Sequence, residues 1–134
     1  MPRESSSLSA PMGVSWLPVE GDSMWPSLRE GDTAEVEPLS GPPRVGDVVL
    51  ARFPHALVLH RVCEFDGRTC SLQGDNVARV DPLLPASRIL GKVRRVCRAG
   101  AVLEHWDVGP TQLGWLRVRV KRKLAAWWGK GRRA

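Results

Sequence analysis

The sequence predicts a mainly β protein, a folded-over antiparallel sheet or partly open barrel with a basic amphipathic helix at its C-terminus. Two observations predict the sheet: short runs of alternating apolar and polar residues, and turn residues at close intervals between these runs. A third observation predicts the helix, namely apolar residues that recur at spacings of three and four near the C-terminus. The length of 134 residues fits one domain with its own core.

Seven segments in the middle of the chain have the alternation and the residue types of strands. They are residues 14–17, 34–37, 47–53, 57–63, 69–73, 92–98 and 101–106. The pairs Asp66-Gly67 and Ala99-Gly100 predict tight turns between successive strands. Short strands at this spacing are typical of small, partly open barrels.

The three cysteines are Cys63, Cys70 and Cys97, an odd number that does not fit a secreted disulfide framework. A two-residue turn at Asp66-Gly67 would place Cys63 opposite Cys70, either as two reduced thiols or, in an oxidising compartment, as a disulfide. The spacing of the cysteines and histidines fits no metal site. We therefore expect neither a metal nor another cofactor.

The net charge of +6 is concentrated at one end of the chain. Residues 113–134 contain eight Lys or Arg and no acid, which leaves about −2 for residues 1–112. A charge confined to the tail argues against a domain that binds nucleic acid with its whole surface. We divide the chain into a flexible N-terminus (1–12), a body (13–109) and a basic extension (110–134).

Ser23 is the first candidate for chemistry, in the segment Gly-Asp-Ser-Met-Trp-Pro at residues 21–26. Pro26 lacks an N–H and holds Trp25 extended, so the segment fits neither a helix nor a strand. Gly21 permits a tight approach of the backbone. The segment therefore predicts a turn that presents Ser23, whose hydroxyl becomes a strong nucleophile only when a base takes its proton.

His60 is the candidate base, and it lies in the predicted strand 57–63. The period-two rule places His60 on one face with Val58 and Val62. Acidic residues follow in Gly-Asp-Asn at residues 74–76 and at Asp81. Taken singly, a strand histidine is more often structural and an acidic turn is more often an Asx-turn. Together with Ser23, these residues form a far more specific pattern.

The order of these segments resembles the signal peptidase and S24/S26 peptidase clan. The resemblance covers residues 19–96, and its further segments are Gly-Asp-Val-Val at 46–49, His-Arg-Val at 60–62 and Ile-Leu-Gly-Lys-Val at 89–93. It implies a catalytic-core fold of the signal-peptidase type for the body. Bacterial enzymes and self-cleaving repressors of the clan use a lysine as base. The histidine here is similar to the endoplasmic-reticulum and archaeal-like branch.

The resemblance implies a serine endopeptidase in which Ser23 attacks the peptide bond and His60 is the general base. It also implies that Asp75 and Asp81 support His60. We prefer Asp81 as the carboxylate that orients the imidazole, and the sequence leaves open which of the two does so.

Gly21, Met24 and Trp25 are the expected substrate-binding residues, although Trp25 equally fits a residue that covers the core. The backbone N–H of Ser23 is the expected oxyanion donor, and Gly21 lacks the hydroxyl that some relatives add. The implied substrate is an extended leader or precursor peptide with small residues before the cut. Two alternatives are a non-catalytic binding module of the same fold and a self-processing regulator.

The basic extension carries an apolar stripe of Leu113, Leu116, Val120, Leu124 and Trp127. A helix fits this stripe, and a strand from Trp115 is the competing prediction. Three functions remain open: contact with an anionic membrane, binding of RNA or an acidic partner, and packing on the body. The candidate contact residues are Trp115, Arg117, Arg119, Lys121, Arg122, Lys123, Trp127 and Trp128. No apolar stretch reaches about 18 residues, and we expect a cytoplasmic protein, peripheral at the inner face of the membrane.

Overall fold

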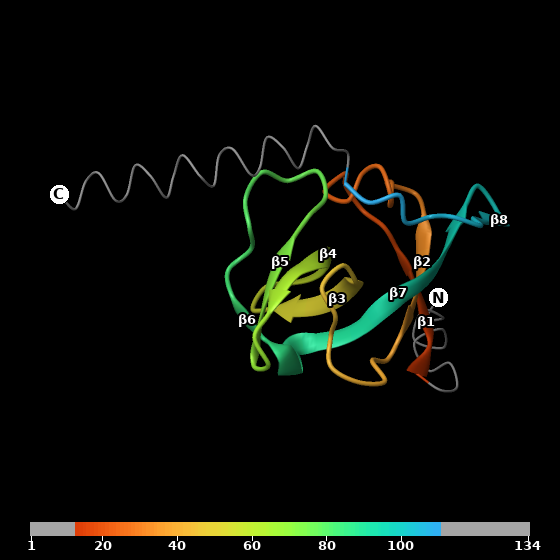
Figure 1. Cartoon of the computed structure of the whole chain (residues 1–134). Helices are drawn as coiled ribbons and strands as arrows, with labels where there is room; N and C mark the ends of the chain where they lie inside the picture. Colours follow the sequence, from red (N-terminus) through yellow and green to blue (C-terminus); the bar gives the residue numbers. More distant parts are fainter. Residues whose placement is uncertain (1–12, 111–134) are drawn as a thin grey trace.

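The computed structural model describes residues 13–110, in which eight antiparallel strands form one sheet (Figure 1). The strands are β1 (Ser15–Pro18), β2 (Thr33–Glu37), β3 (Val48–Phe53), β4 (Ala56–Phe65), β5 (Thr69–Gln73), β6 (Leu84–Pro85), β7 (Ile89–Arg98) and β8 (Ala101–Val102). A 3-10 turn, η2 (Ala86–Arg88), precedes β7. The strand order is β1-β2-β7-β3-β4-β5-β6, with β8 paired to β7.

The long strand β7 joins the two halves of the sheet. Its C-terminal part pairs with β2 and its N-terminal part pairs with β3, and Figure 1 shows it running between these two groups of strands. Irregularities in register at Glu35/Val36 and Leu50/Ala51 flank this crossing. Gly91 lies at the crossing, where a Cβ would come within 2.4 Å of the carbonyl oxygen of Glu37. Only glycine fits this approach, because real Cβ atoms essentially never come closer than 3.0 Å.

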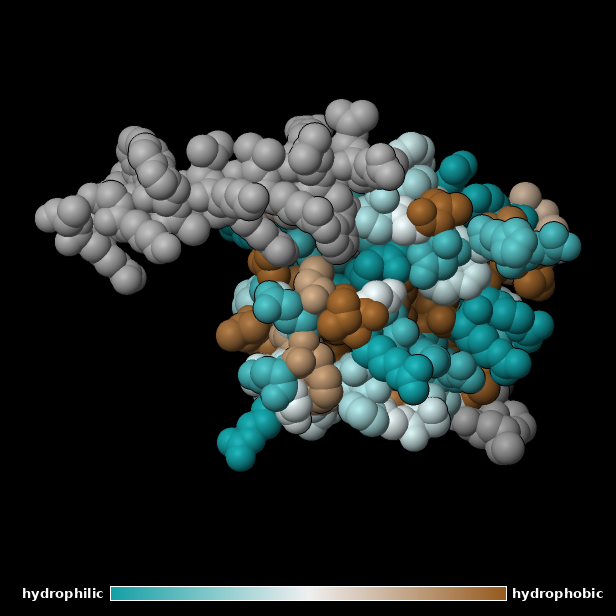
Figure 2. All heavy atoms as spheres, in the orientation of Figure 1, coloured by the Kyte–Doolittle hydropathy of each residue, from teal (hydrophilic) through white to brown (hydrophobic). Residues whose placement is uncertain are grey.

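Two hydrophobic clusters fill the space on either side of this crossing. The first packs Met24 and Leu28 of the β1–β2 connection against β2 and β7. The second lies between β3, β4, β5 and β7. Val48 belongs to the first cluster and its neighbour Val49 to the second, because successive strand residues point to opposite faces. In Figure 2, the apolar residues that remain at the surface form separate patches among hydrophilic side chains.

The predicted antiparallel β architecture is confirmed, and so is the turn at Ala99-Gly100. Both turn residues have positive φ, 53° and 83°, and Arg98 pairs with Ala101 across them. The predicted strand 101–106 is too long, since β8 ends at Val102 and the chain then leaves the sheet. The strand β6 was not predicted, because two residues that include Pro85 carry no period-two signal.

The predicted pairing of Cys63 with Cys70 is wrong. Phe65 pairs with Cys70, and a register shift between Val62 and Glu64 leaves Cys63 at a bulge. None of the three cysteines, all of which lie in the described part of the chain, forms a disulfide. Residues 66–69 connect the paired Phe65 and Cys70, and the Asp66 carboxylate accepts hydrogen bonds from the backbone N–H groups of Arg68 and Thr69.

The two chain ends lie outside the described residues. The flexible segment 1–12 and the amphipathic helix, with all its candidate contact residues from Trp115 to Trp128, therefore stay predictions. Within residues 13–110, no helix has the length and apolar character needed to cross a membrane.

Candidate active site

Ser23 lies on a turn that connects β1 to β2, as its segment predicts. The connection is closed at its base, where the Val19 N–H donates to the carbonyl of Asp32 and the Gly31 N–H donates to the carbonyl of Val19. Met24, only 3 % exposed, anchors the turn in the core, while Ser23 stays partly accessible. We call residues 21–28 the Ser23 turn.

Two further features shape the Ser23 turn. The Trp25–Pro26 peptide bond is cis. Gly21 adopts φ +76°, and its N–H donates to the Glu30 side chain at 2.9 Å. A positive φ is a conformation that other residues rarely adopt, so the glycine suits this position.

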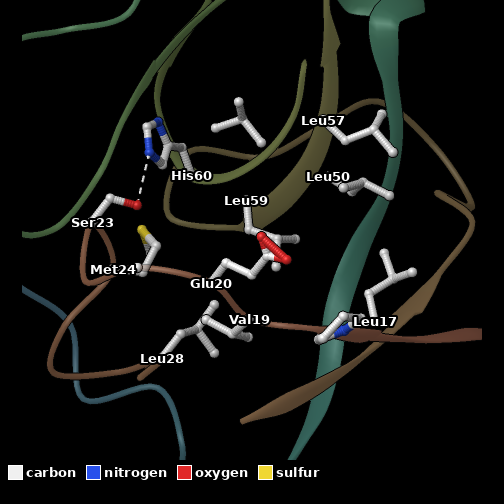
Figure 3. A pocket seen from close by; sticks show the side chains of 13 residues that line it. Leu17, Val19, Glu20, Ser23, Met24, Leu28, Leu50, Leu57, Leu59 and His60 are labelled. Atoms are coloured by element: carbon white, nitrogen blue, oxygen red, sulfur yellow. Dashed lines mark hydrogen bonds between the residues drawn. The ribbon is translucent and has the colours of Figure 1, made fainter. Parts of the chain in front are cut away.

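His60 projects from β4 towards Ser23 (Figure 3). Its Nε2 lies 3.3 Å from Ser23 Oγ. Strand pairing with Val49 fixes the backbone, and the residue is only 8 % exposed. The ring is therefore held with one nitrogen at the nucleophile candidate and little freedom to turn away.

Asp81 binds the other side of the His60 ring. Its carboxylate accepts a hydrogen bond at Nδ1, and its own backbone N–H donates to the carbonyl of Leu72. This contact assigns the Nδ1–H, Nε2-acceptor tautomer to a neutral His60. Ser23, His60 and Asp81 thus form one hydrogen-bonded chain of hydroxyl, imidazole and carboxylate.

Asp75, the second acidic candidate, does not contact His60. It forms a two-bond ion pair with Arg61, with Nε–Oδ1 and Nη2–Oδ2 distances of 2.8 and 2.7 Å. The Asp75 carboxylate is completely buried. Its role in this structure is to hold the loop that carries it, and the orienting contact belongs to Asp81.

Arg61, next to His60, is the residue that sequence reasoning missed. Besides Asp75 it binds both oxygens of Asp107, at 3.1 and 2.9 Å, and the carbonyl of Gly46 at 2.7 Å. Burial alone would lower the pKa of Arg61, but the hydrogen bonds that it donates to Asp75 and then to Asp107 raise the pKa above the usual arginine range. The guanidinium is therefore always charged and joins three segments of the chain.

The loop that contains Asp75 is packed directly on the Ser23 turn. The Asn76 backbone N–H donates to the carbonyl of Ser23 at 2.9 Å, and its side-chain amide donates to the carbonyl of Asp22 at 3.1 Å. A Cβ on Gly74 would lie 2.6 Å from the Ser23 carbonyl oxygen and 3.0 Å from His60 Nε2. Glycine at this position is what lets the nucleophile and base candidates approach each other.

A segment beyond β8 crosses the far side of the Ser23 turn. We call residues 103–109 the strap. Its Val108 N–H donates to Oγ of the fully buried Ser27, and its Asp107 binds Arg61. The indole of Trp106 donates to the carbonyl of Arg94 at 3.0 Å. The strap therefore braces the Ser23 turn from behind and connects it to β7.

A pocket of about 450 Å³ opens beside Ser23 and His60 (Figure 3). Residues of β1, the Ser23 turn, β3 and β4 line it. Two of the three expected substrate-binding residues, Gly21 and Met24, belong to this lining. Trp25 does not. It is 45 % exposed, and the guanidinium of Arg29 stacks over it at 5.6 Å.

Among residues 13–110, no group of three or more His, Cys, Asp or Glu side chains is placed to hold a metal ion. Two comparisons with known proteins bear on the site. A search of curated proteins found no match. The family model described as Peptidase S24-like matches residues 1–94, which include the Ser23 turn, His60 and Asp81. The chain therefore belongs to the peptidase S24-like family, whose fold serves peptidases and related self-cleaving proteins.

Proposed function

We propose that this protein is a serine endopeptidase in which Ser23 is the nucleophile, His60 the general base and Asp81 the carboxylate that orients His60. One observation carries the proposal: the His60 ring bridges Ser23 Oγ, at 3.3 Å, and the Asp81 carboxylate. A structural histidine needs only one such partner, whereas proton transfer from a serine needs both.

The geometry supports a two-step acyl transfer. Ser23 Oγ attacks the peptide carbonyl carbon as His60 Nε2 takes the hydroxyl proton. The tetrahedral intermediate collapses, the C–N bond breaks, and His60 gives the proton to the leaving amine. Water then attacks the acyl-enzyme ester with His60 again as base, which releases the acid product and restores Ser23. Throughout, the Asp81 carboxylate stabilises the imidazolium that forms.

The oxyanion of the intermediate requires a hydrogen-bond donor. In the described part of the chain, no acceptor is bound to the backbone N–H of Ser23, so this group is available. Gly21 has no hydroxyl to add, and its N–H is already bound to Glu30. We propose the Ser23 N–H as the donor from this chain.

The substrate would bind in an extended conformation between β1 and β4. β1 is at the edge of the sheet. The first half of β4, residues 56–60, pairs with β3 but not with β5, because the β4–β5 pairing begins at Arg61. Both strands border the pocket. Free backbone groups on either side of the pocket would allow a peptide to add as a strand, which suits a leader or precursor segment.

The test is active-site labelling combined with peptide cleavage. Wild-type protein should react with a fluorophosphonate and cleave peptides, and Ser23→Ala should lose both while keeping its circular dichroism spectrum. Ser40→Ala, a hydroxyl deletion at an exposed loop, is the matched control and should behave as wild type. Labelling that persists in Ser23→Ala would disprove the nucleophile assignment.

The family fold also serves self-cleaving proteins, so one further measurement separates the two modes of action. If the protein cuts its own chain, purified full-length protein shortens at a rate independent of its concentration. If it acts on other chains, it remains intact and cleaves added peptides at a rate proportional to enzyme concentration.

A further inference from the structure

The pocket beside Ser23 has an apolar wall and one carboxylate. The wall is formed mainly by Leu17, Val19, Leu50, Leu57 and Leu59. Among residues 13–110, Glu20 is the only acidic residue in the lining, and no Lys or Arg contributes to it. Figure 3 shows the side chain of Glu20 extending towards Leu59.

The carboxylates of Glu20 and of the exposed Asp22 have no bound partner in the described part of the chain, whereas three other acids of this region do. Glu30 binds the N–H of Gly21, Asp32 binds Arg98, and Glu35 binds Arg95. Each of these three carboxylates makes a contact that stabilises the fold. The carboxylate of Glu20 serves no such contact, although its place in the wall is set by its neighbours Val19 and Gly21.

The physical chemistry of this lining selects one kind of side chain. A leucine or methionine would bury its apolar surface, but it would also remove water from Glu20 without replacing the lost hydrogen bonds. A lysine or arginine lays an aliphatic stem on the leucines and brings a cation to the carboxylate. An acidic side chain is repelled. The body as a whole supports this choice, since residues 13–110 contain eleven Lys or Arg and thirteen Asp or Glu.

We infer that this pocket is a specificity subsite for a lysine or arginine of the substrate, with Glu20 as its counter-charge. The inference rests on the proposed peptidase function and narrows its substrate class to peptides with a basic residue at one fixed distance from the cut. At about 450 Å³ the pocket has room for this side chain together with a smaller neighbour.

The experiment uses the full-length protein and a mixture of unstructured decapeptides, with the cleaved bonds identified by mass spectrometry. Wild type should show Lys and Arg enriched at one fixed position, and a peptide with Lys there should be cut about fivefold faster than one with norleucine, as for a partly exposed ion pair. Glu20→Gln should lose this difference, and Glu20→Lys should prefer Asp or Glu at the same position. Glu104→Gln, an exposed carboxylate outside the pocket, is the control and should keep the wild-type preference.

Two results separate this inference from the proposed function. If wild type cleaves and Ser23→Ala does not, but no position favours basic residues or Glu20→Gln keeps the preference, then the subsite is wrong and the peptidase stands. If wild type cleaves no peptide, or Ser23→Ala cleaves as well as wild type, then the proposed function fails and the subsite fails with it.

Discussion

Two neighbouring residues of β4 have different roles: His60 belongs to the proposed catalytic site, and Arg61 forms structural ion pairs. His60 and Arg61 point to opposite sides of the strand, as period-two geometry requires. His60 reaches Ser23 and Asp81, while Arg61 binds Asp75 and Asp107. A small shift of β4 would therefore disturb the proposed proton-transfer chain and the buried ion pairs together.

Gly74 offers the sharpest test at the scale of one residue. Gly74→Ala should reduce peptide cleavage at least about tenfold, because the new Cβ, placed 2.6 Å from the Ser23 carbonyl oxygen, must push the Ser23 turn away from His60. Gly41→Ala is the matched control, since a Cβ there meets no atom within 4 Å. Cleavage rates and thermal melts of both variants decide the matter. Wild-type activity in Gly74→Ala would mean that the observed separation of Ser23 and His60 is not required.

The pH dependence of cleavage follows from the role of His60. Histidine is the side chain that ordinarily changes charge between pH 5 and 8, and a protonated Nε2 cannot accept the Ser23 proton. We expect kcat/KM to fall when acid protonates the proposed base, under conditions in which the protein stays folded. A flat profile, with chemistry shown to be rate-limiting, would argue against His60 as the base.

Substitution of Asp81 should lower activity, whereas substitution of Asp75 should lower stability. Asp81→Asn should lower kcat by about a hundredfold or more with little change in stability, because an amide can no longer favour the Nδ1–H tautomer. Asp75→Asn should instead lower the free energy of unfolding by about 3 kcal/mol, because the buried guanidinium of Arg61 loses the negative charge that it is paired with. Urea denaturation and single-turnover cleavage of both variants separate these effects. The reverse pattern would exchange the two roles.

At the scale of elements, the strap and β7 hold the Ser23 turn from two directions. Val108 of the strap donates to Ser27 in the turn, while Asp107 ties the strap to Arg61 of β4. Arg98 of β7 binds Asp32 at the base of the connection through two bonds of 2.9 Å. The matched region of the family model ends at residue 94, before the strap begins. The support of the turn therefore lies partly outside the segment by which the family is recognised.

Asp107 tests the contribution of the strap. Asp107→Asn weakens the contact with Arg61, and since this carboxylate is 39 % exposed the loss should be about 1 kcal/mol of stability. If the strap positions the Ser23 turn, kcat should also fall several-fold with KM unchanged. Glu104→Gln, an exposed residue of the same segment, is the control. A loss of stability with unchanged kcat would assign the strap a purely structural role.

The ion pair of Asp32 with Arg98 predicts an acid-sensitive fold. Burial raises the pKa of Asp32. The hydrogen bonds from Arg98 and from the Arg29 backbone together lower this pKa by more than burial raises it, so the net shift is downward. A lowered folded-state pKa contributes stability above the unfolded pKa of about 4, and this contribution is lost as the pH falls through the folded value. Asp32→Asn should therefore cost about 2 kcal/mol at pH 7 and progressively less as the pH falls below about 4, as measured by urea denaturation. Asp22→Asn, at an exposed site, should show no such pH-dependent difference.

At the scale of the whole molecule, local patterns predicted the sheet better than they predicted its connections. Alternation and turn residues are local properties, and they identified most strands and the turn at Ala99-Gly100. Arg61 binds Asp75 and Asp107, which lie 14 and 46 positions away in the sequence, and no local pattern predicts such pairings. The Cys63 bulge was missed for a related reason, because a bulge is decided by the partner strand.

The candidate site was predictable to a different degree. Ser23, His60 and Asp81 could be named because the resemblance supplied their order. The separate role of Asp75 could not, since it depends on which cation the fold brings near. An arginine beside the candidate base, in a strand of otherwise apolar residues, was the one available signal.

The uneven charge of the whole chain gives a final prediction. We propose that residues 111–134 determine location and take no part in chemistry, since the proposed site lies within residues 13–110. A chain ending at Pro110 should cleave soluble peptides at the wild-type rate but lose binding to vesicles that contain anionic lipid. Binding of the full-length chain should weaken with salt, because the attraction is screened over about 8 Å at physiological ionic strength. Unfolding of the shortened chain would show instead that the tail packs on the body, and retention of RNA but not vesicles by the full-length chain would point to nucleic acid.

The strap also has a consequence for biosynthesis. Translation runs from the N-terminus, so Ser23, His60 and Asp81 all leave the ribosome before Asp107 and Val108, the strap residues that bind Arg61 and Ser27. A growing chain thus carries the nucleophile and base candidates before it carries the segment that braces them. If the strap is needed for the proposed cleavage, activity arises only after residues 103–109 have been made and have folded onto the domain.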